Sequence, residues 1–472
     1  MQSRRSAEGT AHFAGPADQS DASAGPQDMS MLARLADFAE RAFSGSLLRS
    51  GGTVCEVSRS AIAVAGLSAE TRLGNAVTIE TGGRFVPGEV IRIGPESVLV
   101  KSFDETAATH LGARVFCDGP LEIAPDETWK GRVVSALGDP VDGKDRLRPG
   151  TLRRTVDGPA PRAMERDRIG RGLRTGVNVI DVFMPLCFGQ RMGIFAGSGV
   201  GKSTLLAMMA RGTDFDTVVL ALTGERGREV RELLEETMEG RLEKTVTVVA
   251  TGDESPMMRR LAPVTATAIA EYFRDRGENV LLIVDSITRF AHAAREVAIA
   301  AGEPPVSRGY PPSVFSQLPR LLERAGPGHG GGSITGIYAV LVDGDDHNDP
   351  VADSIRGTLD GHIVLDRAIG LGGRFPAVDI LASISRLAGQ SWTPEQARLV
   401  TGMKALVARF EETRDIRMIG AYQPGGDALL DQAVQIVPKI YEVMQQSPNS
   451  PKVADPYAEL AAALRPKEGA NG

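Results

Sequence analysis

The sequence predicts an α/β protein with a small N-terminal β-barrel, a central domain built on a mainly parallel sheet, and a C-terminal helical domain. Short apolar runs broken by Gly, Asn and Pro fill residues 51–117, a texture typical of closely spaced strands in a small barrel. From about Gly176 to Arg386, apolar strands alternate with helical patterns, which indicates a parallel sheet covered on both faces. Beyond Arg386 only helical patterns remain.

The first residues differ in composition and hydrophobic pattern from the rest of the chain. Residues 1–28 are rich in Ala, Gly, Ser, Asp and Gln without periodicity, which predicts a disordered tail. Residues 29–45 place apolar side chains at helical spacing, so we expect an amphipathic helix that either docks a partner or packs on its own domain. The later boundaries are 46–118 for the barrel, 119–386 for the central domain, 387–446 for the C-terminal helices, and 447–472 for a flexible tail.

The composition excludes several classes of protein. A net charge of −7 and an aromatic content of 5% argue against a surface that binds nucleic acid. Three widely spaced cysteines, Cys55, Cys117 and Cys187, argue against a disulfide framework or a zinc site and favour buried thiols in a reducing compartment. No apolar run approaches the roughly 18 residues of a membrane span. We therefore expect a cytosolic protein that associates with a membrane only through partners.

A glycine-rich segment, IFAGSGVGKST, joins an apolar strand to the start of a helix. In such a loop, backbone N–H groups point at phosphate oxygens, the ammonium of Lys202 adds a positive charge, and the hydroxyl of Ser203 can ligate Mg²⁺. The motif departs from the strict pattern only at its first position, which is Ala instead of Gly. The candidate phosphate-binding residues are Ala196, Gly197, Ser198, Gly199, Val200, Gly201, Lys202, Ser203 and Thr204.

Two carboxylates follow apolar strands. Asp285 ends the strand LLIVDS and could hold Mg²⁺ near the phosphate loop, although such a residue alone is more often a helix cap. Glu225, at the end of the strand expected to neighbour the phosphate loop, could orient and polarise a water molecule for hydrolysis. On spacing alone, Glu225 could equally belong to a surface salt-bridge cluster with Arg226, Arg228 and Glu229.

Several long segments resemble the catalytic subunit of rotary ATP synthases and its relatives, in order, from about residue 51 to residue 386. They are TGVNVIDVFMPLCFGQRMGIFAGSGVGKST, LTGERGREV, LLIVDSITRFAHAAREV, GSITGIYAVLVDGDDHNDPVAD and PAVDILASISR. Within that superfamily, the stretch GEPPVSRGYPPSVFSQLPRLLERAG is most similar to the ATPases of type III protein export. The flagellar export ATPases are the first choice, and the homologous injectisome ATPases are the alternative.

The resemblance implies a central RecA-like P-loop domain that hydrolyses ATP with Mg²⁺. Glu225 matches the catalytic carboxylate that activates water, and Arg226 after it matches a residue that contacts phosphate or the neighbouring subunit. Asp285 and Ser203 match the metal site, and Arg289 matches a structural or site arginine.

The resemblance also implies a ring. Phe375 matches an aromatic residue that packs against adenine, with simple core packing as the other interpretation, and Arg386 matches the arginine that reaches into the adjacent subunit's site. One chain then carries both halves of each site, so a homohexamer could complete every site with head-to-tail interfaces. The implied partners are a stalk-like regulator that binds the N-terminal segment, export gate proteins, secretion chaperones and exported flagellar proteins, with no nucleic acid. The implied location is the cytoplasmic face of the inner membrane.

Three other functions fit the sequence less well. A catalytic subunit of a rotary synthase should carry an acidic run in its C-terminal helices, and residues 393–446 offer only Glu411, Glu412 and Asp415, interrupted by Arg414. A ring-shaped RNA translocase should begin with a basic, aromatic RNA-binding domain, which the barrel lacks. A non-enzymatic scaffold should have lost the loop lysine or a site carboxylate, all of which are present.

Overall fold

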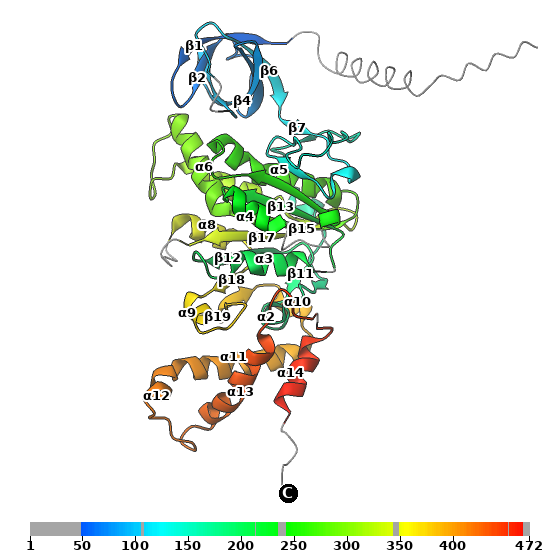
Figure 1. Ribbon diagram of the computed structural model, residues 1–472, viewed down its shortest axis with the longest axis vertical. Coiled ribbons are helices and arrows are strands. Elements are labelled where there is room, and N and C mark those ends of the chain that lie inside the picture. Colours follow the sequence, from blue (N-terminus) through cyan, green and yellow to red (C-terminus); the bar gives the residue numbers. More distant parts are fainter. Residues whose placement is uncertain are drawn as a thin grey trace, which may run out of the picture. The chain divides into compact units, whose positions relative to one another are not determined.

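The computed structural model describes residues 49–104, 108–212, 214–234, 242–342, 349–451 and 453–465 (Figure 1). The chain divides into two compact units, residues 1–49 and 50–472, and the elements below belong to the second. The predicted disordered tail and amphipathic helix, residues 1–28 and 29–45, lie outside the described residues.

The N-terminal strands close into a barrel, as predicted. Its strands follow the order β1-β2-β5-β4-β3-β6. Alternate side chains point inward, and Val64, Ile79, Val98 and Val115 are fully buried in its core. The barrel strands are β1 (Gly51–Val57), β2 (Ile62–Ala65), β3 (Asn75–Thr81), β4 (Arg84–Ile93), β5 (Ser97–Ser102) and β6 (Arg114–Pro120).

A nine-stranded sheet forms the centre of the structure. Its main path is β19-β18-β12-β17-β15-β13-β14-β8, and β16 pairs with β17 beside it. The strands are parallel except for β16 and β19, so the prediction of a mainly parallel sheet is confirmed. The bounds are β8 (Val133–Ser135), β12 (Arg191–Ala196), β13 (Thr217–Thr223), β14 (Thr245–Ala250), β15 (Asn279–Asp285), β16 (Gly326–Pro327), β17 (Ser333–Leu341), β18 (Gly361–Leu365) and β19 (Val378–Ser385).

Helices cover both faces of this sheet, because its strands are apolar on both sides. On β15, Leu282 packs into a core with Phe273 and Phe290 of α5 and α6, and the next residue, Ile283, packs into the opposite core with Leu205 of α3. The helices of the central domain are α2 (Asn178–Phe183), α3 (Lys202–Ala210), α4 (Gly227–Glu232), α5 (Pro256–Arg274), α6 (Ile287–Ala300), α7 (Pro312–Leu322), α8 (Pro350–Thr358) and α9 (Arg367–Leu371).

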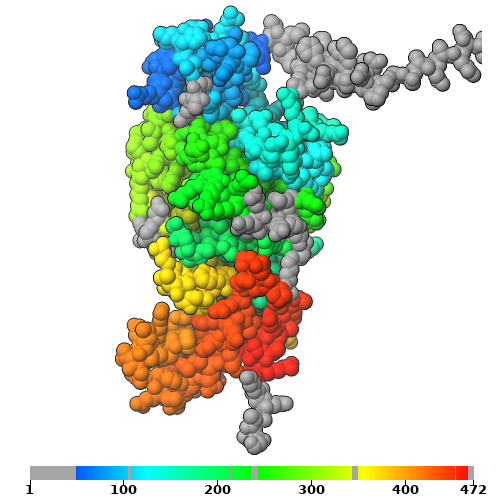
Figure 2. All heavy atoms as spheres, in the orientation of Figure 1, coloured from blue at the N-terminus to red at the C-terminus, as the bar shows by residue number. Residues whose placement is uncertain are grey.

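Short elements connect the barrel to the sheet and were not foreseen. In Figure 2 the connecting segment, in cyan, lies against the green surface of the central domain. It is held by the side chain of Arg324, which is 1% exposed and donates to the carbonyl of Val156 at 2.8 Å. The connecting elements are β7 (Glu122–Ile123), β9 (Arg154–Thr155), β10 (Gly172–Leu173), β11 (Leu186–Cys187) and the 3-10 helices Glu127–Trp129 and Ala163–Glu165; a further 3-10 helix, Leu242–Lys244, leads into β14.

The chain ends in helices, as predicted, but one of them lies in the segment predicted as a flexible tail. Helix α14, within residues 447–472, buries Leu460 completely, and the hydroxyl of Tyr457 donates to the carbonyl of Val182 at 3.2 Å. Asp455 caps this helix by accepting from the N–H of Tyr457. The C-terminal helices are α10 (Ala388–Ser391), α11 (Pro394–Glu412), α12 (Arg414–Met418), α13 (Ala428–Met444) and α14 (Pro456–Leu464).

The three cysteines form no disulfide. Cys187 is buried and Cys117 is half-buried, but Cys55 is exposed, so the expectation of buried thiols is wrong for Cys55. Its position on β1 turns the thiol away from the barrel core. Among the described residues, no helix combines the length and apolar character that crossing a bilayer requires.

Candidate nucleotide-binding active site

The glycine-rich loop has the strand–loop–helix geometry that the sequence predicts. Strand β12 ends at Ala196 and helix α3 begins at Lys202. Gly199 and Gly201 have φ angles of +77° and +92°, in the region that favours glycine. Because Gly201 offers no capping side chain, the first N–H groups of α3 remain available to an anion such as a phosphate.

Three charged side chains from three different elements meet beside this loop. The Nζ atom of Lys202 forms an ion pair with the carboxylate of Asp285 and lies 3.8 Å from Oε1 of Glu225. All three side chains are largely withdrawn from solvent, and that of Asp285 is 3% exposed. The structure therefore brings together the lysine and both carboxylates that the sequence singles out.

The route by which Glu225 reaches the site differs from the prediction. Glu225 follows β13, and two strands, β17 and β15, lie between β13 and the phosphate-loop strand β12. The expectation that these two strands are neighbours is wrong. Sequence order does not fix strand order, and here the chain passes from β12 across the sheet to β13 before β15 and β17 fill the gap.

Arg289 fixes the Glu225 carboxylate from the other side. It lies in the first turn of α6, donates to the carbonyl of Gly224, and places Nη2 3.4 Å from Oε2 of Glu225. Burial raises the pKa of the Glu225 carboxyl above its ordinary value, and the nearby Asp285 charge raises it further. The Lys202 and Arg289 cations lower this pKa but do not cancel the rise. A perturbed carboxyl of this kind is common where protons or water are handled.

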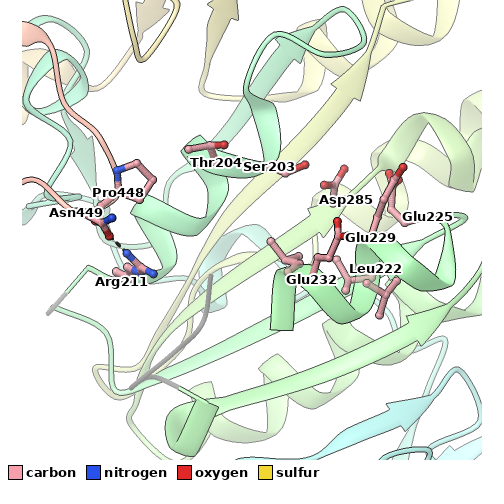
Figure 3. A pocket seen from close by; sticks show the side chains of 12 residues that line it. Ser203, Thr204, Arg211, Leu222, Glu225, Glu229, Glu232, Asp285, Pro448 and Asn449 are labelled. Carbon is pink, nitrogen blue, oxygen red and sulfur yellow. Dashed lines mark hydrogen bonds between the residues drawn. The ribbon is translucent and has the colours of Figure 1, made fainter. Parts of the chain in front are cut away.

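A cavity of about 450 Å³ adjoins these charges (Figure 3). Figure 3 shows Ser203 and Asp285 facing the same hollow from α3 and β15, with Arg211, Pro448 and Asn449 at its far side. Arg211, which directly follows α3, donates to the carbonyl of Pro448 at 2.9 Å and so holds this side of the cavity together. The residues at 448 and 449 were missed because their segment reads as a flexible tail.

The donor set here fits Mg²⁺. The hydroxyl of Ser203 and the carboxylate of Asp285 line one cavity, and Mg²⁺ prefers oxygen ligands. The described residues contain no cluster of three or more His, Cys, Asp or Glu side chains that could hold a metal ion alone. That suits Mg²⁺, which commonly binds through one or two carboxylates together with the phosphates of its substrate.

Arg226 is not brought into this cluster. Its side chain is 85% exposed, and its guanidinium lies 3.6 Å from Glu229 on the first turn of α4. Part of the surface salt-bridge cluster considered from spacing therefore exists, as the pairs Arg226–Glu229 and Arg228–Glu232, whereas the cations that Glu225 faces are Lys202 and Arg289.

Phe375 lies beside the phosphate loop. Its half-exposed ring comes within 3.8 Å of the position that a Cβ atom would take on Gly201. Its carbonyl accepts from the N–H of Gln446 at 2.9 Å. A second residue near the loop was not predicted: Arg367, at the start of α9, donates to the carbonyl of Ser198 at 3.2 Å. Nothing in its surroundings in the sequence distinguishes this arginine from an ordinary surface residue.

Arg386 lies at the opposite end of the strands. The phosphate loop follows the carboxyl end of β12, whereas Arg386 follows Ser385, which pairs with Gly361 at the start of β18. Because β12 and β18 run parallel in register, Arg386 sits near their amino ends. The Arg386 side chain is exposed and makes no hydrogen bond or ion pair with the part of the chain that the structure describes. It cannot reach the site of its own chain from there.

Two family patterns match the chain. Residues 176–385 match the ATP synthase alpha/beta family, nucleotide-binding domain, and residues 392–465 match the T3SS EscN ATPase C-terminal domain. The second match includes the whole of α14.

The chain is also similar to whole proteins. The flagellum-specific ATP synthase of Rhizobium meliloti (strain 1021) is 56% identical over 92% of this chain and 93% of the relative. The type 3 secretion system ATPase of Xanthomonas euvesicatoria is 42% identical over 84% of this chain and 89% of the relative.

Solved structures show the same architecture. The assembled ATPase EscN from the type III secretion system of enteropathogenic E. coli has a TM-score of 0.81 and is 39% identical, covering 87% of this chain and 98% of EscN. EscN in complex with its central stalk EscO has a TM-score of 0.79 at 38% identity, with the same coverage.

Proposed function

Because this chain belongs to the family of flagellum-specific ATP synthases, it is an ATPase of type III protein export, and we propose that it hydrolyses Mg²⁺-bound ATP as a homohexamer at the base of a flagellar export gate. The observation that carries the proposal is the meeting of Lys202, Glu225 and Asp285 beside a strand–loop–helix phosphate site. The injectisome role is the second candidate. The higher identity to a flagellar relative, 56% against 42%, favours the flagellar one.

The reaction is a direct attack of water on the γ-phosphate. Lys202 exchanges Asp285 for phosphate oxygens when nucleotide enters, and Glu225 accepts a hydrogen bond from the attacking water and polarises it. Ser203 and Asp285 would hold Mg²⁺, which neutralises charge on the β- and γ-phosphates when bound. Arg289 keeps the Glu225 carboxylate aimed at the water. Phe375 offers its exposed ring face to the base of the nucleotide.

The positive charge that completes the site in the transition state comes from Arg386 of a neighbouring copy. Arg386 is exposed near the amino ends of β12 and β18, whereas the phosphate loop follows the carboxyl end of β12. It can therefore serve the site of the next subunit but not its own. Such an arginine is worth about 10³- to 10⁵-fold in rate in related nucleotide hydrolases. An assembled state is known for EscN, which supports assembly of this chain.

The partners follow from the same family. EscN has been solved with its central stalk EscO, and we propose a stalk of that kind for this chain. The N-terminal segment, residues 29–45, is the proposed docking site for a regulator. Export gate proteins, secretion chaperones and exported flagellar proteins complete the set, at the cytoplasmic face of the inner membrane.

The test of the ring is ATP hydrolysis against protein concentration for the wild type, for Arg386→Ala and for their mixtures. We expect specific activity to rise cooperatively with concentration, because each site needs a neighbour's arginine, and Arg386→Ala to stay near background at every concentration. In mixtures, activity should follow the wild-type share, because each Arg386→Ala chain deprives one neighbouring site of its arginine. Wild-type activity per chain that stays flat as the protein is diluted, or an Arg386→Ala variant with normal turnover, would contradict the shared site.

The N-terminal segment has its own test. Deleting residues 1–44 should abolish binding to a purified stalk-like regulator in a pull-down, while fluorescent ATP analogue still binds. Loss of nucleotide binding would show instead that the segment is part of the fold.

A further inference from the structure

The backbone that carries Arg386 is anchored by polar groups with no role in the proposed chemistry. The N–H of Arg386 donates to the carbonyl of Asp360 at 2.9 Å. The hydroxyl of the preceding residue, Ser385, donates to the carbonyl of Pro185 at 2.8 Å and accepts from Nε2 of Gln190 at 3.0 Å. The exposed side chain of Arg386 therefore extends from a backbone that hydrogen bonds hold in place.

Gln190 is the central residue of this anchor. Its side chain is fully buried, yet every polar atom is used. Oε1 accepts from the N–H of Cys187 at 2.9 Å, and Nε2 donates to Ser385 and, at 3.4 Å, to the carbonyl of Asp360. A buried amide costs free energy unless it is paired in this way, and full pairing fixes the position of each partner.

The residues that hold the Arg386 backbone are also connected, through strand β12, to the phosphate loop of the same chain. Gln190 directly precedes β12, and the next residue, Arg191, forms a two-pronged pair with the Asp360 carboxylate at 3.1 Å and 3.1 Å. The N–H of Asp360 donates back to the carbonyl of Arg191 at 2.9 Å. Six residues, Arg191–Ala196, therefore separate the anchor of the arginine from the start of the phosphate loop.

We propose that Gln190 is a positioning residue that holds Arg386 at the place from which it acts on nucleotide bound to the neighbouring copy. The inference rests on the proposed function, in which Arg386 works in trans. Gln190 touches no substrate; it acts through the Ser385 hydroxyl and the Asp360 carbonyl, which hold the two peptide groups next to Arg386.

The first measurement compares Gln190→Met with the wild type. Methionine keeps the length of the side chain but removes its hydrogen bonds. We expect kcat to fall about 10- to 100-fold, as when a positioned catalytic group is displaced by about 1 Å, while the affinity for a fluorescent ATP analogue stays within about twofold. The matched control is Gln390→Met, at an exposed glutamine four residues after Arg386, which should keep full activity.

Subunit complementation separates an effect through Arg386 from an effect on the chain's own loop. Glu225→Gln subunits have an inactive site but a correctly held Arg386. Gln190→Met subunits have an intact site but a poorly held Arg386. Mixing them should raise activity clearly above the mean of the two, because Gln190→Met sites then receive a well-held arginine from a neighbour. A mixture that only averages would show that Gln190 acts within its own site, and would overturn the proposal.

A reference mixture keeps the two hypotheses apart. Arg386→Ala mixed with Glu225→Gln must also recover activity. If it does not, the shared site fails and the inference falls with it; if it does, but Gln190→Met keeps full activity or is not rescued, only the inference fails. Should Gln190→Met lose its fold in thermal unfolding, Ser385→Ala, which removes the hydroxyl between Gln190 and Pro185, takes its place in the same mixtures with the same expected outcome.

Discussion

Lys202 is neutralised within the free protein. Its ammonium pairs with Asp285 and lies near Glu225, and the three side chains are withdrawn from solvent. A buried ammonium without counter-charges would be costly, so the two carboxylates stabilise Lys202 in this position. In the proposed reaction, phosphate oxygens that enter the loop would replace Asp285 as partners of Lys202 and leave this carboxylate available to Mg²⁺.

Replacing Glu225 by Gln separates binding from chemistry. Glutamine keeps the size of the side chain but cannot polarise water as a carboxylate does, so we expect turnover to fall by about 10²- to 10⁴-fold. Removing a negative charge near the phosphates should leave ATP affinity equal or higher. Steady-state hydrolysis and titration with a fluorescent nucleotide measure the two effects. Glu229→Gln, in the same cavity wall, is the control, and normal turnover of Glu225→Gln would refute the mechanism.

The raised pKa of Glu225 predicts a pH dependence. The ionised carboxylate is the active form, so kcat/KM should fall as the pH drops through that raised pKa. Arg289 lowers the pKa, and Arg289→Gln removes its positive charge. The acid limb of the pH profile should therefore move to higher pH in this variant, whereas Arg228→Gln, at an exposed arginine of α4, should leave it in place. A limb that moves to lower pH would assign it to another group.

Single residues were predictable where local pattern and chemistry coincide. The glycines of the loop, Lys202 and Asp285 belong to a strand–turn–helix pattern that can be read from the chain. Arg367 and Pro448 were not predictable, because they reach the site through the packing of α9 and of the segment after α13, and nothing local marks them.

Two candidate site residues flank strand β19 (Val378–Ser385), one before it and one after it. Phe375 precedes the strand and lies by the phosphate loop of its own chain, and Arg386 follows it at the far edge of the sheet. The antiparallel direction of β19 makes this possible, since a parallel strand would reverse the two ends. Its eight residues span roughly 26 Å at about 3.3 Å per residue.

Helix α14 should contribute to stability. Leu460 is fully buried in the core that also holds α2, α3 and α13, so Leu460→Ala should lower the free energy of unfolding by about 2–5 kcal/mol. Chemical denaturation measures the change. Ala461→Ser, on the exposed side of the same helix, should change it by less than about 0.5 kcal/mol. Equal stability of the Leu460 variant and the wild type would mean that α14 is not docked.

The same helix shows what local pattern can and cannot give. Asp455 followed by Pro456 and an apolar run is a helix start signal. The helix that follows has only nine residues, and it comes after a segment rich in Pro, Ser and Asn, so the signal was easily overlooked. Longer helices such as α11 and α13, and the strands of the barrel, were predictable because their periodicity extends over many residues.

At the scale of the whole molecule, strand order was the part that could not be predicted. Alternating strands and helices indicate a parallel sheet, but the positions of β17 and β15 between β12 and β13 depend on long-range packing. The contacts between the barrel and the central domain were equally unpredictable from the sequence. They include an ion pair between Glu89 of β4 and Arg260 of α5, and a 2.8 Å hydrogen bond from Ser255 to the carbonyl of Phe103.

The placement of Arg386 at the edge opposite the phosphate loop has a consequence for the cell. If Arg386 completes the neighbour's site as we propose, a copy that is not assembled lacks that arginine and idles. ATP consumption would then follow the number of closed rings and not the number of chains, and a reserve of unassembled copies would not drain the nucleotide pool.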